Sequence, residues 1–548
     1  MRLDPEVCER ARVSRDARFD GRFFVGVTTT GVYCRSVCPV RLPRPENVIF
    51  FPTRAAAVEA GFRPCLRCRP EAAPGAPTLV GPSVTVTRAL QRISDGALDH
   101  GTLAALAASL GVGARQLSRL FAAHVGASPQ TVAQTRRLHC GKKLLDETDL
   151  SIAEIAMSAG YGSVRRFNAH FKEVYGRTPS QLRAPARNGA HPHKREVRAG
   201  RDLGETSLTG LPGYRGRAVE RDVPAGLRSG AMMTSREDDQ KSDAVLFRLR
   251  LSFRPPYCWA DALDFFARRA VPGMEIVRGT TYARTILVDG LPGLLSVSPV
   301  PGENYLLCET RLSGARFLFD VAERVRRVFD LDADPLEIEN CLLQDPEMTG
   351  FVQGNPGLRL LGCWDGFEAA VRAVLEQRVS FAAARTLTRR LVDAFGAVCE
   401  TSEINGADGE LCRLFPSPEQ LVGVERSELA ALGIAGMKAT GLLALSQAVC
   451  SGAVSFDPGQ DLESFAENMT ALPGIGPWTA HYTAMRAFGF PDSFLHSDLV
   501  LVRRAEELLG KGAPFTPARL FKRAEVWRPW RAYASLYLWR WSPDQVEQ

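Results

Sequence analysis

The chain has 548 residues, of which 45% are hydrophobic and 24% are charged. These fractions are those of an ordinary globular protein, and the length predicts about three to five domains. No apolar run reaches the length of a membrane span, and the charged opening MRLDPEVCERARVSRD lacks the apolar core of a signal peptide. The composition therefore argues against a membrane or secreted protein and predicts a protein of the cytoplasm.

Basic residues concentrate at the N-terminal end of the chain. Residues 1–200 contain 30 Lys and Arg against 16 Asp and Glu, a net charge of +14, whereas residues 201–548 contain 38 against 45, a net charge of −7. A basic segment of this kind favours nucleic acid as a partner. The acidic remainder would have to bind nucleic acid through local features rather than through its overall charge.

Thirteen cysteines are scattered along the chain, apart from one cluster in GVYCRSVCPV and FRPCLRCRP. An odd, dispersed set argues against a disulfide framework and indicates one metal or redox cluster. Two thiol pairs joined by a segment that can fold back favour a tetrahedral zinc site over an iron–sulfur cluster. On spacing alone, zinc that only holds a small domain together is the preferred interpretation. The four clustered residues are Cys34, Cys38, Cys65 and Cys68.

The segment RFDGRFFVGVTTTGVYCRSVCPVRLPRPENVIFF, followed by AAVEAGFRPCLRCRP, resembles the N-terminal domain of Ada, the methylphosphotriester-repair domain of the adaptive response to alkylation. The resemblance implies a small α+β domain, at 1–78, that binds one Zn²⁺ through the four cysteines. It also implies that Cys34 is the methyl acceptor, activated as a zinc-bound thiolate. Methylation removes one negative charge, so affinity for DNA should rise. Nearby candidates for phosphate contacts are Arg35, Arg41 and Arg44.

Helical periodicity begins near Val84 and includes two similar segments, LAALAASLGVGARQLSRLFAAHVG and SIAEIAMSAGYGSVRRFNAHFKEVYG. In each segment an Ala is followed four residues later by a Gly, as in Ala107 with Gly111 and Ala156 with Gly160. A small residue lets two helices cross closely, and Gly permits the turn between them. The pattern therefore predicts two helix-turn-helix units.

The signature SVRRFNAHFKEVYGRTPSQLR gives the region 79–186 a resemblance to the all-α DNA-binding domain of AraC-type transcriptional activators. The resemblance implies two recognition helices, at about 114–124 and 163–175, that enter successive major grooves. The side chains expected to reach bases or phosphates are Arg115, Gln116, Arg119, Arg165, Arg166 and Asn168. The side chains expected in the core are Leu117, Leu120, Phe121, Phe167 and Phe171.

Residues 187–244 are rich in Gly, Arg and Asp with little periodicity, which predicts a flexible linker. After it, AVLFRLRLSF and YARTILVDGLPGLLSVSPV alternate like strands, and DALDFFARRA is helical between them. This pattern predicts an α+β domain at 245–350. From about Asp365 onward the sequence is almost wholly helical, and we expect an all-α domain at 351–548.

The stretch LPGIGPWTA, at 472–480, predicts a helix, a tight Gly turn and a second helix. Gly474 and Gly476 would let backbone N–H groups approach a phosphate, so this helix-hairpin-helix indicates sequence-independent DNA binding. Asp498 follows at the spacing at which base-excision glycosylases carry their essential carboxylate. A lone Asp at such a position is more often a helix cap.

The half at 247–541 resembles AlkA, the DNA-3-methyladenine glycosylase II of the helix-hairpin-helix superfamily, through RPPYCWADALDFFARRA, NPGLRLLGCWDGFEAAVRAVLEQRVSFAAART, the hairpin and EVWRPWRAYASLYLWRW. The resemblance implies catalysis by Asp498. An aromatic pocket suits cationic alkylated bases through stacking and cation–π attraction of about 1–2 kcal/mol. The implied pocket residues are Trp478, Tyr482, Trp539 and Phe265, and the implied contacts to the DNA backbone are Gly474, Gly476 and Thr479.

Departures from related patterns sharpen the expected chemistry. Bifunctional glycosylases of this superfamily carry a Lys where Trp478 stands, so we expect hydrolysis without lyase activity. The last cysteine is Cys450, so we expect no iron–sulfur cluster. The family's DNA wedge position carries Arg378, which could enter the vacated stack through its guanidinium plane. A Pro-Cys-His-Arg motif is absent, and direct repair of O6-methylguanine is therefore not expected.

The chain thus looks like an Ada–AlkA fusion. Methyl transfer from methylphosphotriesters to Cys34 would switch on sequence-specific transcription activation, and the C-terminal half would excise alkylated bases. The alternative is a methylation-sensing regulator whose glycosylase half binds DNA but is inactive. The expected partners are double-stranded DNA, at damaged sites and promoter operators, and RNA polymerase. The expected location is the bacterial cytoplasm, at the nucleoid and without membrane contact.

Overall fold

The computed structural model describes residues 4–74, 84–99, 101–148, 150–183, 244–399, 410–457, 461–509 and 516–540. The predicted linker at 187–244 lies outside the described residues except for its last position. The chain divides into a large unit, Met1–Pro179 with Asp243–Gln548, and a small one, Ser180–Ser242, and the elements that carry the sites belong to the large unit. Among the described helices, none combines the length and apolar character needed to cross a membrane.

The N-terminal part of the large unit is a small mixed sheet with short helices. The strands follow the order β3-β1-β2-β4, with β1 antiparallel to both neighbours and β2 parallel to β4. Its apolar core contains Phe23 and Val25 together with three of the clustered cysteines, so the metal cluster is part of this core. The elements are α1 Pro5–Ser14, β1 Phe24–Val27, β2 Val32–Arg35, β3 Val48–Phe51, α2 Arg54–Glu59 and β4 Arg63–Pro64.

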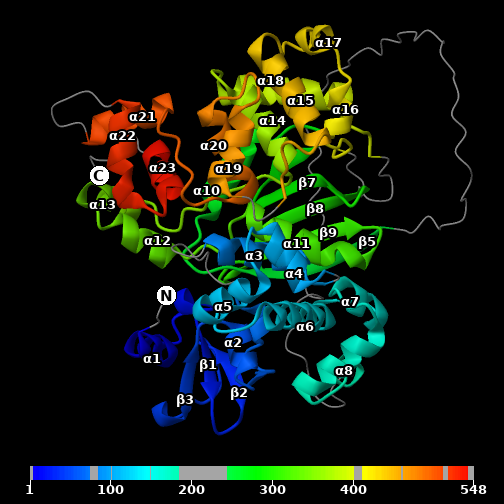
Figure 1. Ribbon diagram of the computed structural model, residues 1–548, viewed down its shortest axis with the longest axis vertical. Coiled ribbons are helices and arrows are strands. Elements are labelled where there is room, and N and C mark those ends of the chain that lie inside the picture. The colour runs from blue at the N-terminus through cyan, green and yellow to red at the C-terminus, as the bar shows by residue number, and fades with distance from the viewer. Residues whose placement is uncertain are drawn as a thin grey trace, which may run out of the picture. The chain divides into compact units, whose positions relative to one another are not determined.

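The next part is all helical and contains the two predicted helix-turn-helix units. Both turns use a Gly with positive φ, +70° at Gly111 and +80° at Gly160, and the small residues Ala107 and Ala156 are buried. The prediction of two such units is confirmed. The helices, drawn in blue to cyan in Figure 1, are α3 Val84–Ser94, α4 Leu103–Ser109, α5 Ala114–His124, α6 Pro129–Glu147, α7 Ile152–Ser158, α8 Val164–Tyr175 and α9 Pro179–Arg183.

A five-stranded antiparallel sheet opens the C-terminal half, as the alternating pattern predicted. Its strand order is β5-β9-β8-β7-β6, and α10 packs on β6 and β7 while α11 packs on β5. Figure 1 labels β7, β8, β9 and β5, which lie side by side. The elements are β5 Val245–Ser252, α10 Trp259–Arg269, β6 Glu275–Arg278, β7 Thr281–Val288, β8 Leu291–Pro299, β9 Tyr305–Leu312 and α11 Leu318–Val328.

The remaining helices form two apolar cores. One core joins the helices α14–α20. The other joins α12 and α13 to α20–α23 with one residue of α14, so α14 and α20 contribute to both. The two cores meet where the helix-hairpin-helix and Asp498 lie. The helices are α12 Pro335–Leu342, α13 Thr349–Gly354, α14 Gly366–Glu376, α15 Phe381–Phe395, α16 Pro418–Val422, α17 Arg426–Ala431, α18 Met437–Cys450, α19 Leu462–Thr470, α20 Pro477–Phe488, α21 Leu499–Leu509, α22 Pro517–Arg523 and α23 Arg531–Arg540.

Candidate functional sites

The four clustered cysteines converge on one point. Cys34 lies on β2, Cys38 follows it, and Cys65 and Cys68 come directly after β4, which pairs with β2. Their sulfur atoms all lie within 4.8 Å of one another. Tetrahedral zinc, with Zn–S bonds of about 2.3 Å, places its sulfur ligands roughly 4 Å apart. The residues therefore fit one Zn²⁺.

The electrostatics of the cluster also require a cation. Hydrogen bonds among the sulfur atoms, with Cys38 the main partner of Cys34, raise the pKa of Cys34. The same kind of hydrogen bond, to Cys34 foremost, raises the pKa of Cys68 and lowers the pKa of Cys38 and Cys65. Such sulfurs share protons, and a divalent cation is needed before all four become thiolates. Zn²⁺ held by the four sulfurs would supply this charge.

Arg35 belongs to the framework of this site. Its Nε donates to Asp20 Oδ1 at 2.9 Å, its Nη1 donates to the Cys68 carbonyl at 3.3 Å, and its backbone N–H donates to Cys68 Sγ at 3.4 Å. The guanidinium is therefore committed to holding the ligand loop. Of the three arginines considered for phosphate contacts, Arg41 and Arg44 have exposed side chains.

The residue before Cys34 connects the metal cluster to the helical part. Tyr33 is fully buried, and its hydroxyl lies 2.9 Å from Nε2 of His139 on α6. Burial lowers the pKa of His139, so this ring is neutral at physiological pH. Sequence patterns did not indicate this pair, because the two residues are 106 positions apart.

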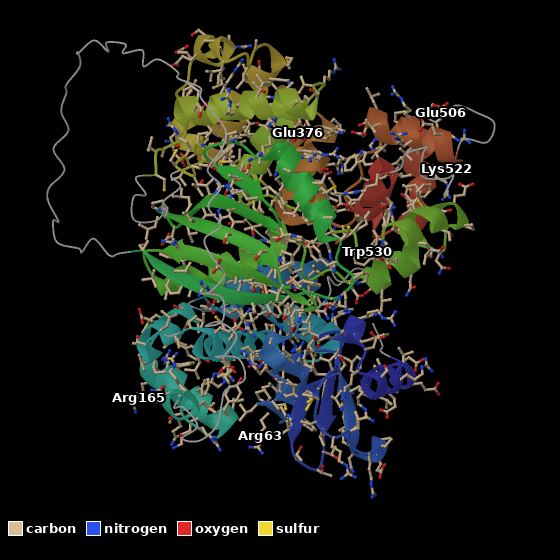
Figure 2. All side chains as sticks on the ribbon, turned by 180° about the vertical axis from the view of Figure 1, so that it is seen from behind. Arg63, Arg165, Glu376, Glu506, Lys522 and Trp530 are labelled. Atoms are coloured by element: carbon tan, nitrogen blue, oxygen red, sulfur yellow. The ribbon has the colours of Figure 1, made fainter. Side chains whose placement is uncertain are left out.

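The two predicted recognition helices, α5 and α8, have most of their predicted polar side chains exposed. Arg115, Gln116 and Arg119 on α5 are exposed, as are Arg165 and Arg166 on α8, where Figure 2 labels Arg165. Asn168 is half-buried, and its Oδ1 has no hydrogen-bond partner among the described residues. Of the predicted core residues, Leu120 is half-buried, and the fully buried ones are Leu117, Phe121, Phe167 and Phe171.

Asp498 is held by two tryptophans. The indole Nε1 of Trp478 donates to Oδ2 at 2.8 Å, and Nε1 of Trp539 donates to Oδ1 at 3.3 Å. Oδ1 also accepts the backbone N–H of Leu501 at 2.9 Å, so the residue caps α21 as well. The helix-cap interpretation and the catalytic one are therefore compatible. The cap fixes the carboxylate, and the two indoles orient it.

The predicted base-pocket aromatics divide into two groups. Trp478 and Trp539 converge on Asp498, whereas Phe265 and Tyr482 line a cavity between α10, α14, α20 and the sheet. Tyr482 joins the two groups, because its ring stacks on Trp478 with centroids 4.9 Å apart and planes 9° apart. We refer to these four residues together as the aromatic surface, in which Tyr482 stacks on Trp478 and the two indoles bond to the carboxylate.

The helix-hairpin-helix has the predicted form, with α19 and α20 flanking the Gly turn. Gly474 has φ +85°, and a Cβ there would meet the Met437 carbonyl at 2.6 Å, so this Gly also permits close packing on α18. Gly476 caps α20 and is open on its Cβ side. The first N–H groups of a helix have no partner within it and suit a phosphate. Thr479 as a whole is almost fully buried, and its predicted contact with the DNA backbone stays a prediction.

Gln377 is a residue of this site that the sequence interpretation missed. Its Nε2 donates to the Gly474 carbonyl at 3.0 Å and to Thr479 Oγ1 at 2.9 Å. Next to it, Arg378 is exposed in the left-handed region at φ +53°. Gln377 therefore braces the loop that carries Arg378 against the hairpin. Its place beside Arg378 in EQRVS was the available signal.

Replacing Gln377 by Ala is expected to weaken binding to undamaged duplex DNA about tenfold, because two buried hydrogen bonds that align loop and hairpin are lost. Fluorescence anisotropy with a labelled duplex measures this change. Gln344→Ala is the matched control, since that amide donates only to the Asn340 carbonyl at an exposed site and should leave affinity unchanged. Equal affinities of the Gln377 variant and the wild type would contradict the bracing role.

The fold and these sites define a class of protein. It joins a four-thiol metal centre and paired helix-turn-helix units to a helix-hairpin-helix glycosylase fold. Family models match in the same order: the metal binding domain of Ada at 7–71, a helix-turn-helix domain at 106–185, the AlkA N-terminal domain at 248–365, and the HhH-GPD superfamily base excision DNA repair protein at 371–529.

Whole-chain comparison identifies the family. The chain is 37% identical over 548 residues to the probable bifunctional transcriptional activator/DNA repair enzyme AlkA of Mycobacterium tuberculosis, covering 100% of this chain and 98% of that protein. It therefore belongs to the family of bifunctional transcriptional activator/DNA repair proteins. DNA-3-methyladenine glycosylase 2 of Escherichia coli is 32% identical over 299 residues, 54% of this chain and 99% of that protein. AdaA of Bacillus subtilis is 32% identical over 176 residues, which cover 32% of this chain and 80% of that protein.

Proposed function

We propose that this protein is a bifunctional alkylation-damage response protein. It transfers methyl groups from DNA methylphosphotriesters to Cys34, activates transcription in response, and excises alkylated bases of the 3-methyladenine type. The observation that carries the proposal is the carboxylate of Asp498, which two indole N–H groups hold beyond a helix-hairpin-helix. The four-thiol cluster upstream of two helix-turn-helix units supports the regulatory half.

Methyl transfer uses the sulfur of Cys34, by its place in the family pattern. The thiolate attacks the methyl carbon of the phosphotriester, an S–C bond forms, and the C–O bond breaks with its electron pair on the phosphate oxygen. The product is a thioether, so each protein acts once. The cluster becomes one charge less negative, and repulsion from neighbouring DNA phosphates falls. Recognition helices α5 and α8 then bind the operator more tightly.

Base excision uses the hairpin, the aromatic surface and Asp498. The N–H groups at the start of α20 hold the DNA backbone while the damaged base leaves the stack. Trp478, Tyr482, Trp539 and Phe265 receive the base. As the glycosidic bond breaks, positive charge develops on the sugar, and the Asp498 carboxylate stabilises it or orients the attacking water. A hydrolytic, monofunctional reaction fits Trp478 at the position where lyases carry Lys.

The partner of both halves is double-stranded DNA. As an activator the protein would contact RNA polymerase at its promoter, and its substrate places it in the bacterial cytoplasm at the nucleoid. The working domain limits are 1–78 for the zinc domain, 79–186 for the helix-turn-helix domain, 187–244 for the linker, 245–350 for the α+β domain and 351–548 for the glycosylase domain.

The test is release of 3-methyladenine from duplex DNA by the full chain, with and without prior methylation by methylphosphotriester DNA. We expect free base from the wild type in both states. Absence of base release, with a methylation-dependent rise in operator affinity retained, would favour the alternative in which the protein is a regulator with an inactive glycosylase half.

Replacing Arg378 by Ala tests the proposed wedge. We expect single-turnover excision from base-paired lesions to slow about tenfold, and excision of an unpaired lesion to change less, because an unpaired base costs less to extrude. Arg385→Ala removes another exposed arginine of this region and serves as the charge control. Equal slowing by both variants would assign Arg378 to general phosphate attraction instead.

A further inference from the structure

Two arginines lie directly behind the aromatic surface that leads to Asp498. The guanidinium carbon of Arg269 lies 4.2 Å from the Phe265 ring centroid, and that of Arg486 lies 4.6 Å from the same centroid. Arg486 also lies 5.2 Å from the Tyr482 centroid, and Tyr482 stacks on Trp478. Cations and rings therefore alternate in one stack, which ends at the Trp478 indole bonded to Asp498.

This arrangement opposes the substrate that the pocket is proposed to take. A base that alkylation has made cationic would approach a surface in which two of the rings, Phe265 and Tyr482, also contact guanidinium groups. Like charges within several ångströms repel by about 1 kcal/mol or more, even at an effective dielectric constant of about 20. A negative charge close to the two guanidinium groups would reduce this repulsion.

The carboxylates deeper in the cavity are already paired. Glu368 Oε2 lies 2.8 Å from Arg284 Nη2, and Glu275 Oε2 lies 2.6 Å from Arg372 Nη2. Tyr282 further donates its hydroxyl to Glu275 at 2.7 Å. Two buried carboxylates thus balance two buried guanidinium groups, and this cluster leaves no charge for Arg269 and Arg486.

Glu376 remains among the residues that line the cavity. It ends α14 (Figure 2), and its side chain is 11% exposed. Its Oε1 lies 3.6 Å from Arg269 Nε, an atom that has no hydrogen-bond partner among the described residues. Arg486 Nη1 donates to the Leu361 carbonyl, which carries no net charge. Glu376 is thus the carboxylate placed to offset both arginines.

We propose that Glu376 determines specificity for positively charged bases by reducing the net charge of the guanidinium pair behind the base pocket from +2 to +1. The proposal rests on the proposed glycosylase function. Glu376 acts through Arg269 and does not touch the scissile bond. Its carboxylate lowers the positive potential at the aromatic surface, so a cationic base binds while a neutral base is little affected. The property at stake is the ratio of the two excision rates.

The test compares single-turnover base release by the full chain from duplexes that contain 7-methylguanine, which is cationic, or hypoxanthine, which is neutral. For Glu376→Gln we expect the rate on 7-methylguanine to fall about tenfold and the rate on hypoxanthine to change less than about twofold. Glu376→Asp, which retains the charge, should keep most of the preference. Glu309→Gln breaks an exposed ion pair with Arg248 and is the matched control.

A double variant separates electrostatics from packing. Adding Arg269→Gln to Glu376→Gln removes both partners, and the ratio of the two rates should return toward the wild-type value whatever the absolute rates. Equal loss on both substrates in the single variant, or no recovery of the ratio in the double variant, would overturn the proposal. No release of either base by the wild type would instead refute the proposed glycosylase function.

Discussion

Replacement of Asp498 by Asn is expected to lower the rate of 3-methyladenine release by about a thousandfold, the largest effect of any single change in the C-terminal half. Asn removes the negative charge that stabilises the developing sugar cation. Asn keeps one side-chain oxygen, which can replace Oδ1 and accept the N–H of Leu501, and Asn is a good helix cap; its NH₂ group then replaces Oδ2 and no longer accepts the Trp478 indole N–H. The lost Trp478 hydrogen bond should cost about 1–3 kcal/mol of stability, and affinity of the folded variant for undamaged DNA should be unchanged.

Asp461→Asn provides the matched control for this experiment. Asp461 caps α19, the first helix of the hairpin, and accepts the Ser464 N–H at 3.0 Å, but it has no indole partner. Single-turnover kinetics on labelled duplex should show wild-type rates for this variant. If the Asp498 variant retains full activity, or loses DNA affinity in step with its rate, Asp498 is a structural cap and the catalytic carboxylate lies elsewhere.

Replacement of Cys34 by Ala is expected to abolish methyl transfer from methylphosphotriester DNA, because the proposed acceptor sulfur is gone. In the wild type, methylation should raise operator affinity at least about fivefold through the lost negative charge, and the variant should show no such rise. The measurements are mass spectrometry of the cysteine peptides and operator binding before and after exposure.

Removing zinc with a chelator should unfold the zinc domain.

Two other cysteines make this experiment decisive. Cys8 lies in the same apolar core at 1% exposure but outside the metal cluster, so Cys8→Ala should methylate normally. Cys65 is the most exposed of the four clustered cysteines, and exposure alone would favour it as the acceptor. A methyl group found on Cys65 would contradict the assignment of Cys34 and leave the metal site in place.

Local sequence patterns predicted a structural element well where only one type of residue can fill a given structural role. The Ala and Gly pairs marked both helix-turn-helix units, because only small residues fit the crossing and Gly adopts the positive φ of the turn. Thiol spacing marked the metal cluster for a similar reason, since four close sulfurs suit a tetrahedral cation. The hairpin and Asp498 were found by motif and spacing.

The sequence by itself determined the order of domains, the metal ligands, the recognition helices and the candidate carboxylate, because each depends on residues close together in the chain. Only the tertiary structure decided which charged groups and amides from distant parts of the chain contact one another. Gln377 reaches the hairpin about one hundred positions away, and Glu376 faces Arg269 from another helix. Such pairs leave no periodic trace, since charge balance depends on distance in space. The predicted pocket residues did not include the two arginines that contact Phe265, because these arginines come from positions that no sequence pattern marks.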